Sequence, residues 1–334
     1  MPLLLDSAPP RSAVASRGAD GLTVGLINNM PDAAVEATER QFVWLLRAAA
    51  PDVVVRLKFF GMTEVPRSER LRAELAGRYR DIGELWETRL DGLIVTGTEP
   101  RAEDLREEPY WATFGKLVDW AQKNTASTIW SCLAAHAAVL HLDGIERRRL
   151  AQKKFGVFAC DAVSAHPLLK NAAPRLNVPH SRYNDLPEAA LTASGYRLLS
   201  RSAAAGVDMF VQEEGLFSLF LFLQGHPEYE AATLLREYRR DVERFLRGER
   251  ADYPAMPQGY FNPSAAVLAN GFRARALRAP RDGLIAEFPT AALAAALDAS
   301  WRRSAVGLYR IWVDYLKERR AERRPPAVFM RRSG

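Results

Sequence analysis

Short apolar runs alternate with helical stretches over the first 160 residues of this 334-residue chain. We expect buried strands at 22–28, 52–60, 91–97, 127–131 and 155–159, and helices at 33–50, 68–80, 109–124 and 132–142. The strand runs are continuously apolar, which is typical of parallel strands covered on both faces. This alternation predicts an α/β fold, in which a doubly wound, mostly parallel sheet carries helices on both faces.

Beyond this region the pattern predicts a hairpin-like pair of strands, 209–212 and 216–223, and helices over 230–247 and most of 291–320. The segment 254–263 is rich in proline, glycine and aromatic residues and is expected to be a linker. The predicted organisation is a flexible leader (1–20), an α/β catalytic domain (21–250), a linker and helical C-terminal extension packing on the same domain (251–320), and a basic tail (321–334).

Composition limits the class of protein. Hydrophobic residues make up 48% of the chain and charged residues 26%, a balance typical of globular proteins. No apolar run reaches the roughly 18 residues of a membrane-spanning helix. With only two cysteines there is no disulfide framework, so we expect a cytoplasmic protein.

Most of the net charge of +6 lies in the segment from Lys317 to the C-terminus, which holds seven basic residues and two acids. A solvated helix end explains this better than an arm that binds nucleic acid. A second basic cluster, at 147–154, suits a small anionic ligand or simple solvation.

Cys132 is the first candidate for chemistry. It lies between the predicted strand 127–131 and a helix of small residues, the arrangement of a nucleophile elbow. A helix N-terminus stabilises a thiolate, and backbone amides in such a turn can bind an oxyanion. A buried structural cysteine is the competing interpretation. Zinc binding by Cys132, His136 and His141 is disfavoured because no further ligand is in register.

His226 and Glu228 are the second candidate. They follow the strand 216–223, and an extended His-Pro-Glu places both side chains on one side. Glu228 could then orient the imidazole as the acid of a triad does. Because ligands of doubly wound sheets collect at the carboxyl ends of strands, we expect Cys132, His226 and Glu228 to form one catalytic site.

Five motifs in order along the chain carry a family resemblance. They are Leu26–Pro31 (LINNMP), Asp91–Gly97 (DGLIVTG), Phe155–Phe158 (FGVF), Pro179–Tyr183 (PHSRY) and Gly225–Tyr229 (GHPEY). In these motifs the chain resembles the homoserine O-acyltransferase family, which includes homoserine O-succinyltransferase (transsuccinylase). The resemblance covers about residues 22–315 and implies a class I glutamine-amidotransferase-like fold.

The resemblance implies a ping-pong acyl transfer in methionine biosynthesis. Cys132 would take the acyl group from an acyl-CoA co-substrate, and His226, held by Glu228, would activate the hydroxyl of L-homoserine. The remaining implied roles are substrate binding by Lys153, Ser181 and Arg240, and an oxyanion hole at Gly97, Thr98 and Leu133. The resemblance also implies a homodimer that acts on small molecules, with no bound cofactor or metal and no nucleic-acid or membrane partner.

Several positions depart from the family pattern. Leu133 and Ala134 replace a tryptophan and a small residue, and His136 replaces an uncharged residue. Arg101 occupies the position that helps set acyl-donor choice, where a guanidinium could pair with a succinyl carboxylate. Asp32 follows Met-Pro where lysines are usual, and Gly259–Pro289 is longer than the family norm.

These departures favour succinyl-CoA over acetyl-CoA as donor and leave serine open as an acceptor. A glutamine-amidotransferase-like hydrolase and a non-catalytic binding protein on the same scaffold are the alternative functions.

Overall fold

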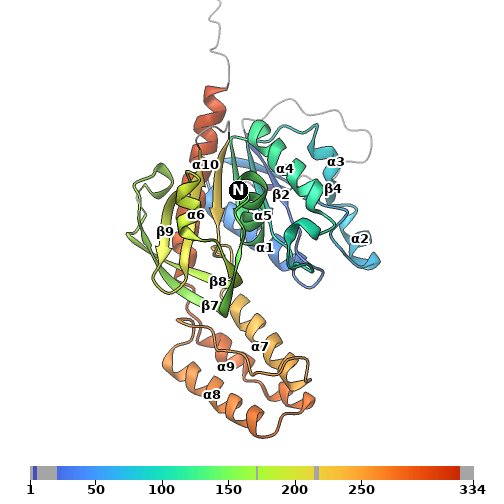
Figure 1. Ribbon diagram of the computed structural model, residues 1–334, viewed down its shortest axis with the longest axis vertical. Helices are drawn as coiled ribbons and strands as arrows, with labels where there is room; N and C mark the ends of the chain where they lie inside the picture. The colour runs from blue at the N-terminus through green and yellow to red at the C-terminus, as the bar shows by residue number, and fades with distance from the viewer. Residues whose placement is uncertain (1–2, 6–20, 171, 214–217, 324–334) are drawn as a thin grey trace, which may run out of the picture.

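The computed structural model describes residues 3–5, 21–170, 172–213 and 218–323 (Figure 1). Within these residues the strands form one sheet in the order β1-β3-β2-β5-β6-β11-β10-β9-β7-β8, with β4 pairing β3 at the side. The strands are β1 (Leu3–Leu5), β2 (Gly21–Ile27), β3 (Val54–Gly61), β4 (Tyr79–Asp81), β5 (Gly92–Thr96), β6 (Ser127–Ser131), β7 (Arg148–Ala162), β8 (Arg175–Asp185), β9 (Arg197–Ser202), β10 (Gly206–Gln212) and β11 (Leu219–Leu223).

The strands from β1 to β11 in that order pair in parallel, and their register brings the predicted site motifs together. Thr96 at the end of β5 pairs with Ser131 at the end of β6, and Ser131 pairs with Leu223 at the end of β11. Three strands therefore end in one row at the same edge of the sheet. The turns that carry Gly97, Cys132 and His226 leave from this row.

Helices cover both faces of the sheet, as the continuous apolar strands predict. One face packs against α1 (Val35–Ala49) and α10 (Trp301–Glu322), where Trp312 Nε1 donates to Ser127 Oγ at 2.9 Å. The opposite face packs against α3 (Ile82–Leu85), α4 (Trp111–Asn124) and α5 (Leu133–Asp143). The α/β fold expected from the sequence is confirmed.

A helical lobe lies below the sheet in Figure 1. Its helices α7 (Thr233–Leu246), α8 (Pro263–Arg278) and α9 (Thr290–Ala295) share a separate apolar core that also includes Phe155 of β7 and Trp301 of α10. Helix α10 then returns to the sheet and packs against α1. The two short helices α2 (Glu69–Leu75) and α6 (Glu188–Ala193) complete the set among the described residues.

The remaining strands, β10, β9, β7 and β8, pair antiparallel. Here the sequence-based expectation was incomplete, because β9 was not predicted. The strand β8 was not predicted either, and 155–159 is only part of β7. Buried and exposed positions are mixed along both strands, and charged side chains fill many exposed ones. Neither strand therefore has the long apolar run that revealed the parallel strands.

Other boundaries also differ from expectation. The helix predicted over 68–80 ends at Leu75, and Tyr79–Asp81 forms β4 after a turn at Gly77. The helix predicted over 291–320 is interrupted between α9 and α10, and α8 follows directly on the predicted linker. Leu3–Leu5 of the predicted leader pairs with β3, while the rest of the leader and the tail from 324 lie outside the described residues. No described helix is long and apolar enough to cross a membrane.

Candidate active site

Cys132 sits at the tight turn between β6 and α5. Its φ of 53° makes it the one non-glycine residue with positive φ in the described part of the chain. Its backbone N–H donates to Leu223 O at 2.7 Å, and its carbonyl accepts the N–H of Ala135 as the helix begins. The thiol is half-buried. This strained geometry is that of a nucleophile elbow, and it presents the sulfur at the row of strand ends.

The His226 imidazole is paired with Glu228. His226 Nδ1 lies 2.8 Å from Glu228 Oε1, and the side chain of Glu228 is only 5% exposed. Burial alone would lower the pKa of His226, but charge and hydrogen bonding from Cys132 and Glu228 raise that pKa well above its ordinary value of 6.5. Cys132 and Glu228 therefore both favour the charged imidazolium form of His226.

The turn after β5 closes over the start of α5. A Cβ on Gly97 would lie 2.5 Å from Leu133 Cβ and 3.0 Å from Leu133 N, so only glycine permits this approach. Thr98 follows in the same turn. The backbone N–H groups predicted to bind an oxyanion therefore belong to two segments that meet beside Cys132.

A second polar cluster lies next to the His226 loop, where Glu237 of α7 is the shared partner. Ser181 Oγ donates to Glu237 Oε2 at 2.5 Å, and Lys153 Nζ lies 3.5 Å from Glu237 Oε2 and 3.5 Å from Asp241 Oδ2. Tyr229 OH donates to Glu237 Oε1 at 2.8 Å. The Tyr229 ring stacks on the His226 imidazole with centroids 4.3 Å apart, so this cluster borders the catalytic pair.

Arg240 joins the same cluster from the next turn of α7. Its side chain is 51% exposed and contacts Asp241 Oδ1 at 3.2 Å. Burial lowers the pKa of Arg240, and the charges of Asp241, Glu237 and Glu99 more than reverse this effect. Glu99 belongs to the turn after β5, so the charge of this turn also acts on Arg240.

The sequence-based prediction named Lys153, Ser181 and Arg240 but missed Glu237, Asp241 and Tyr229. A signal was available, since Glu237 and Asp241 lie three residues before and one residue after Arg240 on one helix. Tyr229 immediately follows the His-Pro-Glu segment.

Other predicted positions lie at the edges of this region. Arg101 is exposed, and its backbone N–H donates to Glu108 Oε1. His136 does not face Cys132 as a metal ligand would, because His136 Nε2 hydrogen-bonds Gln224 Oε1 at 2.9 Å. In the basic cluster at 147–154, Arg147 donates to the carbonyls of Ala102 and Glu103, and so ties the cluster to the Arg101 segment.

Comparison with known proteins gives a consistent result. A family model described as homoserine O-succinyltransferase matches residues 10–322. A homoserine O-succinyltransferase of Rhodopseudomonas palustris is 50% identical over 92% of this chain and 90% of the relative. One of Methylorubrum extorquens is 50% identical over 89% of this chain and 88% of the relative.

Among solved structures, the chain is similar to a glutamine amidotransferase of Thermotoga maritima. The TM-score is 0.49 at 13% identity, over 90% of this chain and all of that one (100%).

Proposed function

This chain belongs to the homoserine O-succinyltransferase family, and from that premise we propose that it transfers a succinyl group from succinyl-CoA to the hydroxyl of L-homoserine. The observation that carries the proposal is the placement of Cys132 beside a His226–Glu228 pair at one row of strand ends. Family membership makes it an acyltransferase.

In the first half-reaction the Cys132 thiolate attacks the thioester carbonyl of succinyl-CoA. A bond forms between Sγ and the carbonyl carbon, and the charge passes to the carbonyl oxygen, where the amides of Thr98 and Leu133 can donate hydrogen bonds. The carbon–sulfur bond to CoA then breaks. The departing thiolate takes the proton of the His226 imidazolium, so the enzyme is left with a Cys132 succinyl thioester and a neutral imidazole.

In the second half-reaction the homoserine hydroxyl attacks this thioester. His226 accepts the hydroxyl proton as the carbon–oxygen bond forms, and the Cys132 thiolate leaves as the carbon–sulfur bond breaks. O-succinylhomoserine departs, and the thiolate–imidazolium pair is restored. Glu228 stabilises the imidazolium in both steps because its carboxylate is buried against Nδ1.

The amino-acid acceptor needs partners for both of its charges. Arg240, half exposed at the site, supplies a fixed cation for the acceptor's carboxylate. Glu237 supplies a carboxylate for the ammonium group, and Lys153, Ser181 and Tyr229 hold Glu237 in place. Because Tyr229 also stacks on His226, an acceptor bound to Glu237 lies within reach of the catalytic base.

The succinyl donor is supported by the names of the relatives and by Arg101. This exposed guanidinium follows the turn that forms the oxyanion site, where it can pair with the distal carboxylate of a succinyl group. An acetyl group offers no such charge.

Mixing the protein with succinyl-CoA, without acceptor, tests the proposal. Intact mass should show one added succinyl group on the wild type and on Cys160→Ala, and none on Cys132→Ala. Cys132→Ala should also lose turnover by at least about 10³-fold, because it removes the proposed nucleophile. Wild-type turnover should be faster with succinyl-CoA than with acetyl-CoA, and faster with homoserine than with serine.

Undiminished turnover in Cys132→Ala would contradict the mechanism. Equal rates with both acyl donors would contradict the assigned donor and the role of Arg101.

A further inference from the structure

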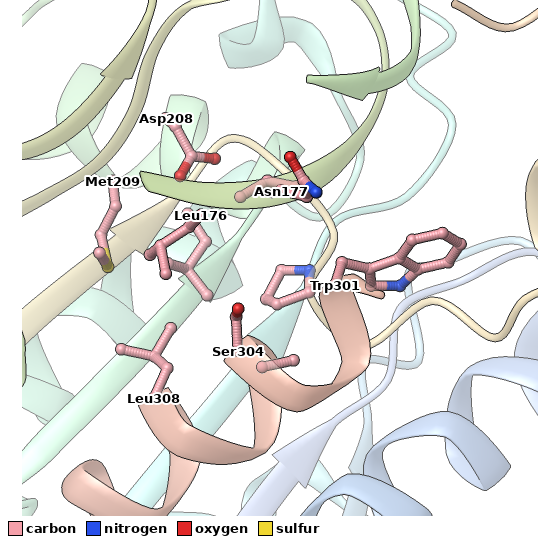
Figure 2. A pocket seen from close by; sticks show the side chains of 11 residues that line it. Leu176, Asn177, Asp208, Met209, Trp301, Ser304 and Leu308 are labelled. Atoms are coloured by element: carbon pink, nitrogen blue, oxygen red, sulfur yellow. The ribbon is translucent and has the colours of Figure 1, made fainter. Parts of the chain in front are cut away.

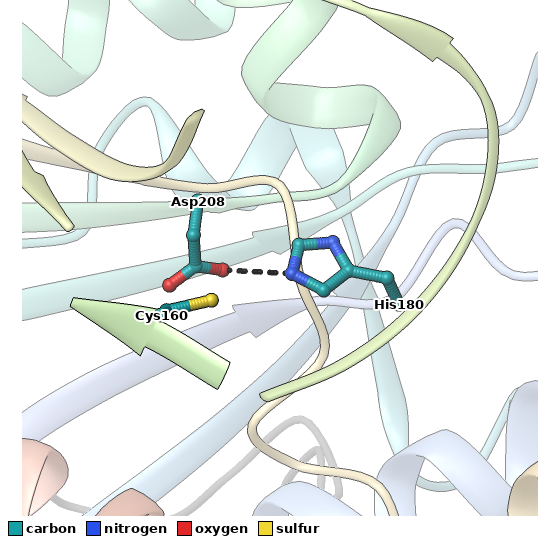
Figure 3. A group of neighbouring side chains, drawn as sticks. All are labelled: Cys160, His180 and Asp208. Atoms are coloured by element: carbon teal, nitrogen blue, oxygen red, sulfur yellow. Dashed lines mark ion pairs between the residues drawn. The ribbon is translucent and has the colours of Figure 1, made fainter. Parts of the chain in front are cut away.

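A buried polar group behind the catalytic loop is not used in the reaction above. Cys160 of β7, His180 of β8 and Asp208 of β10 place their ligand-type atoms within 4.8 Å of one another (Figure 3). Cys160 and His180 are fully buried and Asp208 is 4% exposed. His180 belongs to the PHSRY motif, and its role is not explained by the substrate cluster.

The hydrogen bonds around His180 argue against a metal site. Arg182 Nε donates to His180 Nδ1 at 3.3 Å, so Nδ1 is unprotonated and the proton of the neutral ring is on Nε2. Nε2 is the atom that faces Asp208, and a protonated nitrogen cannot bind a metal. Burial also raises the pKa of Cys160, which keeps it a thiol, and the nearby guanidinium opposes a second cation.

His180 and Asp208 also lie against each other. His180 Nε2 lies 3.2 Å from Asp208 Oδ1, and Ser200 Oγ donates to Asp208 Oδ2 at 2.7 Å. Burial lowers the pKa of His180, in opposition to Asp208, so the ring stays neutral. A neutral imidazole that accepts from Arg182 and a carboxylate that accepts from Ser200 can therefore remain inside the protein.

This pair touches the backbone that carries the catalytic histidine. A Cβ on Gly225 would lie 2.7 Å from Asp208 Oδ1 and 3.0 Å from His180 Nε2, so the loop rests directly on both side chains. The backbone N–H of His226 donates to Pro179 O at 2.7 Å, and that of Gln224 to Asp208 O at 2.8 Å. The loop is thus fixed to β8 and β10 on the two sides of Gly225.

Packing on the other side of the loop is less complete. A mainly apolar cavity is lined by Pro227 of the loop, with Trp301, Ser304 and Leu308 of α10 on one side and Asp208 at its opposite wall (Figure 2). Helix α10 holds the loop further on, where Trp301 Nε1 donates to Tyr229 O at 3.0 Å. The loop is therefore packed closely on the side of β8 and β10, where Val178, His180 and Asp208 would all crowd a Cβ on Gly225.

We propose that His180 and Asp208 are positioning residues for His226, because together they fix the Gly225 backbone and so the approach of the imidazole to Cys132. This inference rests on the proposed transfer through Cys132 and His226. A misplacement of about 1 Å at a reacting group costs on the order of 10²-fold in rate. Acceptor binding is assigned to Glu237 and Arg240 of α7. The loop reaches Glu237 through Tyr229, whose carbonyl is held separately by Trp301 of α10.

The test compares four variants by steady-state kinetics, by the rate of Cys132 succinylation and by thermal unfolding. His180→Leu, which removes the ring nitrogens, and Asp208→Asn, which keeps the shape of the carboxylate, should each lower kcat and the succinylation rate by about 10²-fold. The KM for homoserine should stay within about threefold of wild type. His180→Gln, which restores an N–H near the position of Nε2, should recover kcat to within about tenfold.

Cys160→Ala is the matched control, because Cys160 lies in the same group but contacts neither side chain through a hydrogen bond; its thiol is placed to donate to Phe158 O. It should keep wild-type kcat, and elemental analysis of the wild type should find no stoichiometric metal. Equal loss in Cys160→Ala together with bound metal would overturn the proposal in favour of a metal site. Folded Asp208→Asn with wild-type kcat would also overturn it, and Asp208→Asn decides the matter if His180→Leu does not fold.

A wild type that transfers no succinyl group would instead reject the proposed function.

Discussion

The parallel and antiparallel parts of the sheet carry different residues of the proposed active site. The parallel strands β5, β6 and β11 end in turns that carry Gly97, Cys132 and His226. The antiparallel strands β7 and β8 carry Lys153 and Ser181 along their length, and these side chains meet α7 from outside the sheet. We thus assign catalysis to the ends of the parallel strands. We assign acceptor binding to the surface of β7 and β8 that contacts α7.

The physical reason lies in how each arrangement presents atoms. A parallel strand that ends at a helix start offers backbone N–H groups and a helix dipole, which suit a developing oxyanion and a thiolate. An antiparallel strand with one face away from the core offers a row of charged side chains, which suit a zwitterion. If this division holds, variants in the first part should change kcat, and variants in the second should change the KM for homoserine.

The largest effect should come from Glu228→Gln, which keeps the shape of the side chain but removes its charge. We expect kcat to fall by about 10³- to 10⁴-fold with the KM for homoserine little changed, as for other carboxylates that orient a catalytic imidazole. The pKa of His226 is raised by Glu228, so its loss lowers that pKa. The alkaline limb of the kcat/KM profile for succinyl-CoA should then move to lower pH.

Steady-state kinetics between pH 5 and 10 measure this effect. If Glu228→Gln changed only the KM for homoserine, catalysis would not be separated from acceptor binding in the way we propose for the parallel and antiparallel parts of the sheet.

A smaller effect is expected for Glu237→Gln. It removes the charge that we assign to the acceptor's ammonium group, and hydrogen bonds to charged groups contribute about 1.5–3 kcal/mol. The KM for homoserine should rise by about 10- to 100-fold, while the rate of Cys132 succinylation stays at the wild-type value. Glu243→Gln, on the same helix but paired with Arg247 at 2.6 Å, is the control and should change neither quantity.

Slower succinylation in Glu237→Gln would show that the substrate cluster also supports the chemistry. The two parts of the sheet would then not be separable.

The smallest effect concerns the free energy of unfolding and involves the contact between α5 and the end of β11. His136 of α5 bonds Gln224 at the end of β11, and burial lowers the pKa of His136 from 6.5 to about 3. In the unfolded chain the His136 imidazole becomes protonated near pH 6.5, whereas the folded chain keeps it neutral. The free energy of unfolding therefore decreases as the pH falls below 6.5. Between pH 7.5 and pH 5 this one group costs about 2 kcal/mol of unfolding free energy.

Urea unfolding of His136→Gln at both pH values should show a correspondingly smaller loss than wild type. His141→Gln, a half-exposed histidine on the same helix, should keep the wild-type difference. An unchanged pH dependence in His136→Gln would mean that other groups govern acid stability.

Much of the parallel part could be predicted, because its strands are apolar on both faces and each ends at a helix start. Ser127–Ser131 was predicted to the residue, and Cys132 was placed at the turn that follows it. The pairing of His226 with Glu228 was predicted, but from an extended His-Pro-Glu backbone. The structure instead forms the pair in a turn, where the Tyr229 N–H donates to His226 O at 3.2 Å. The catalytic, substrate-binding and oxyanion roles of the named residues stay predictions until the variants are measured, as do the homodimer, the cytoplasmic location and the domain boundaries.

The antiparallel part was harder to predict because its strands carry charged and apolar residues together. The strand Arg175–Asp185 includes His180, Ser181 and Arg182, and no local pattern distinguishes it from a loop. Glu237 was missed because an acid on an amphipathic helix is ordinarily solvent-exposed. Only contact with Lys153, Ser181 and Tyr229 marks it as part of a site.

The sequence by itself determined the layered α/β fold, the family and the turn that presents Cys132, since these depend on local hydrophobic periodicity and short motifs. The tertiary structure alone decided which charges face one another. Residues such as His180 and Asp208, or Lys153 and Glu237, meet through strand order and helix packing. Their interaction depends on distance and burial in space, and neither quantity is set by spacing along the chain.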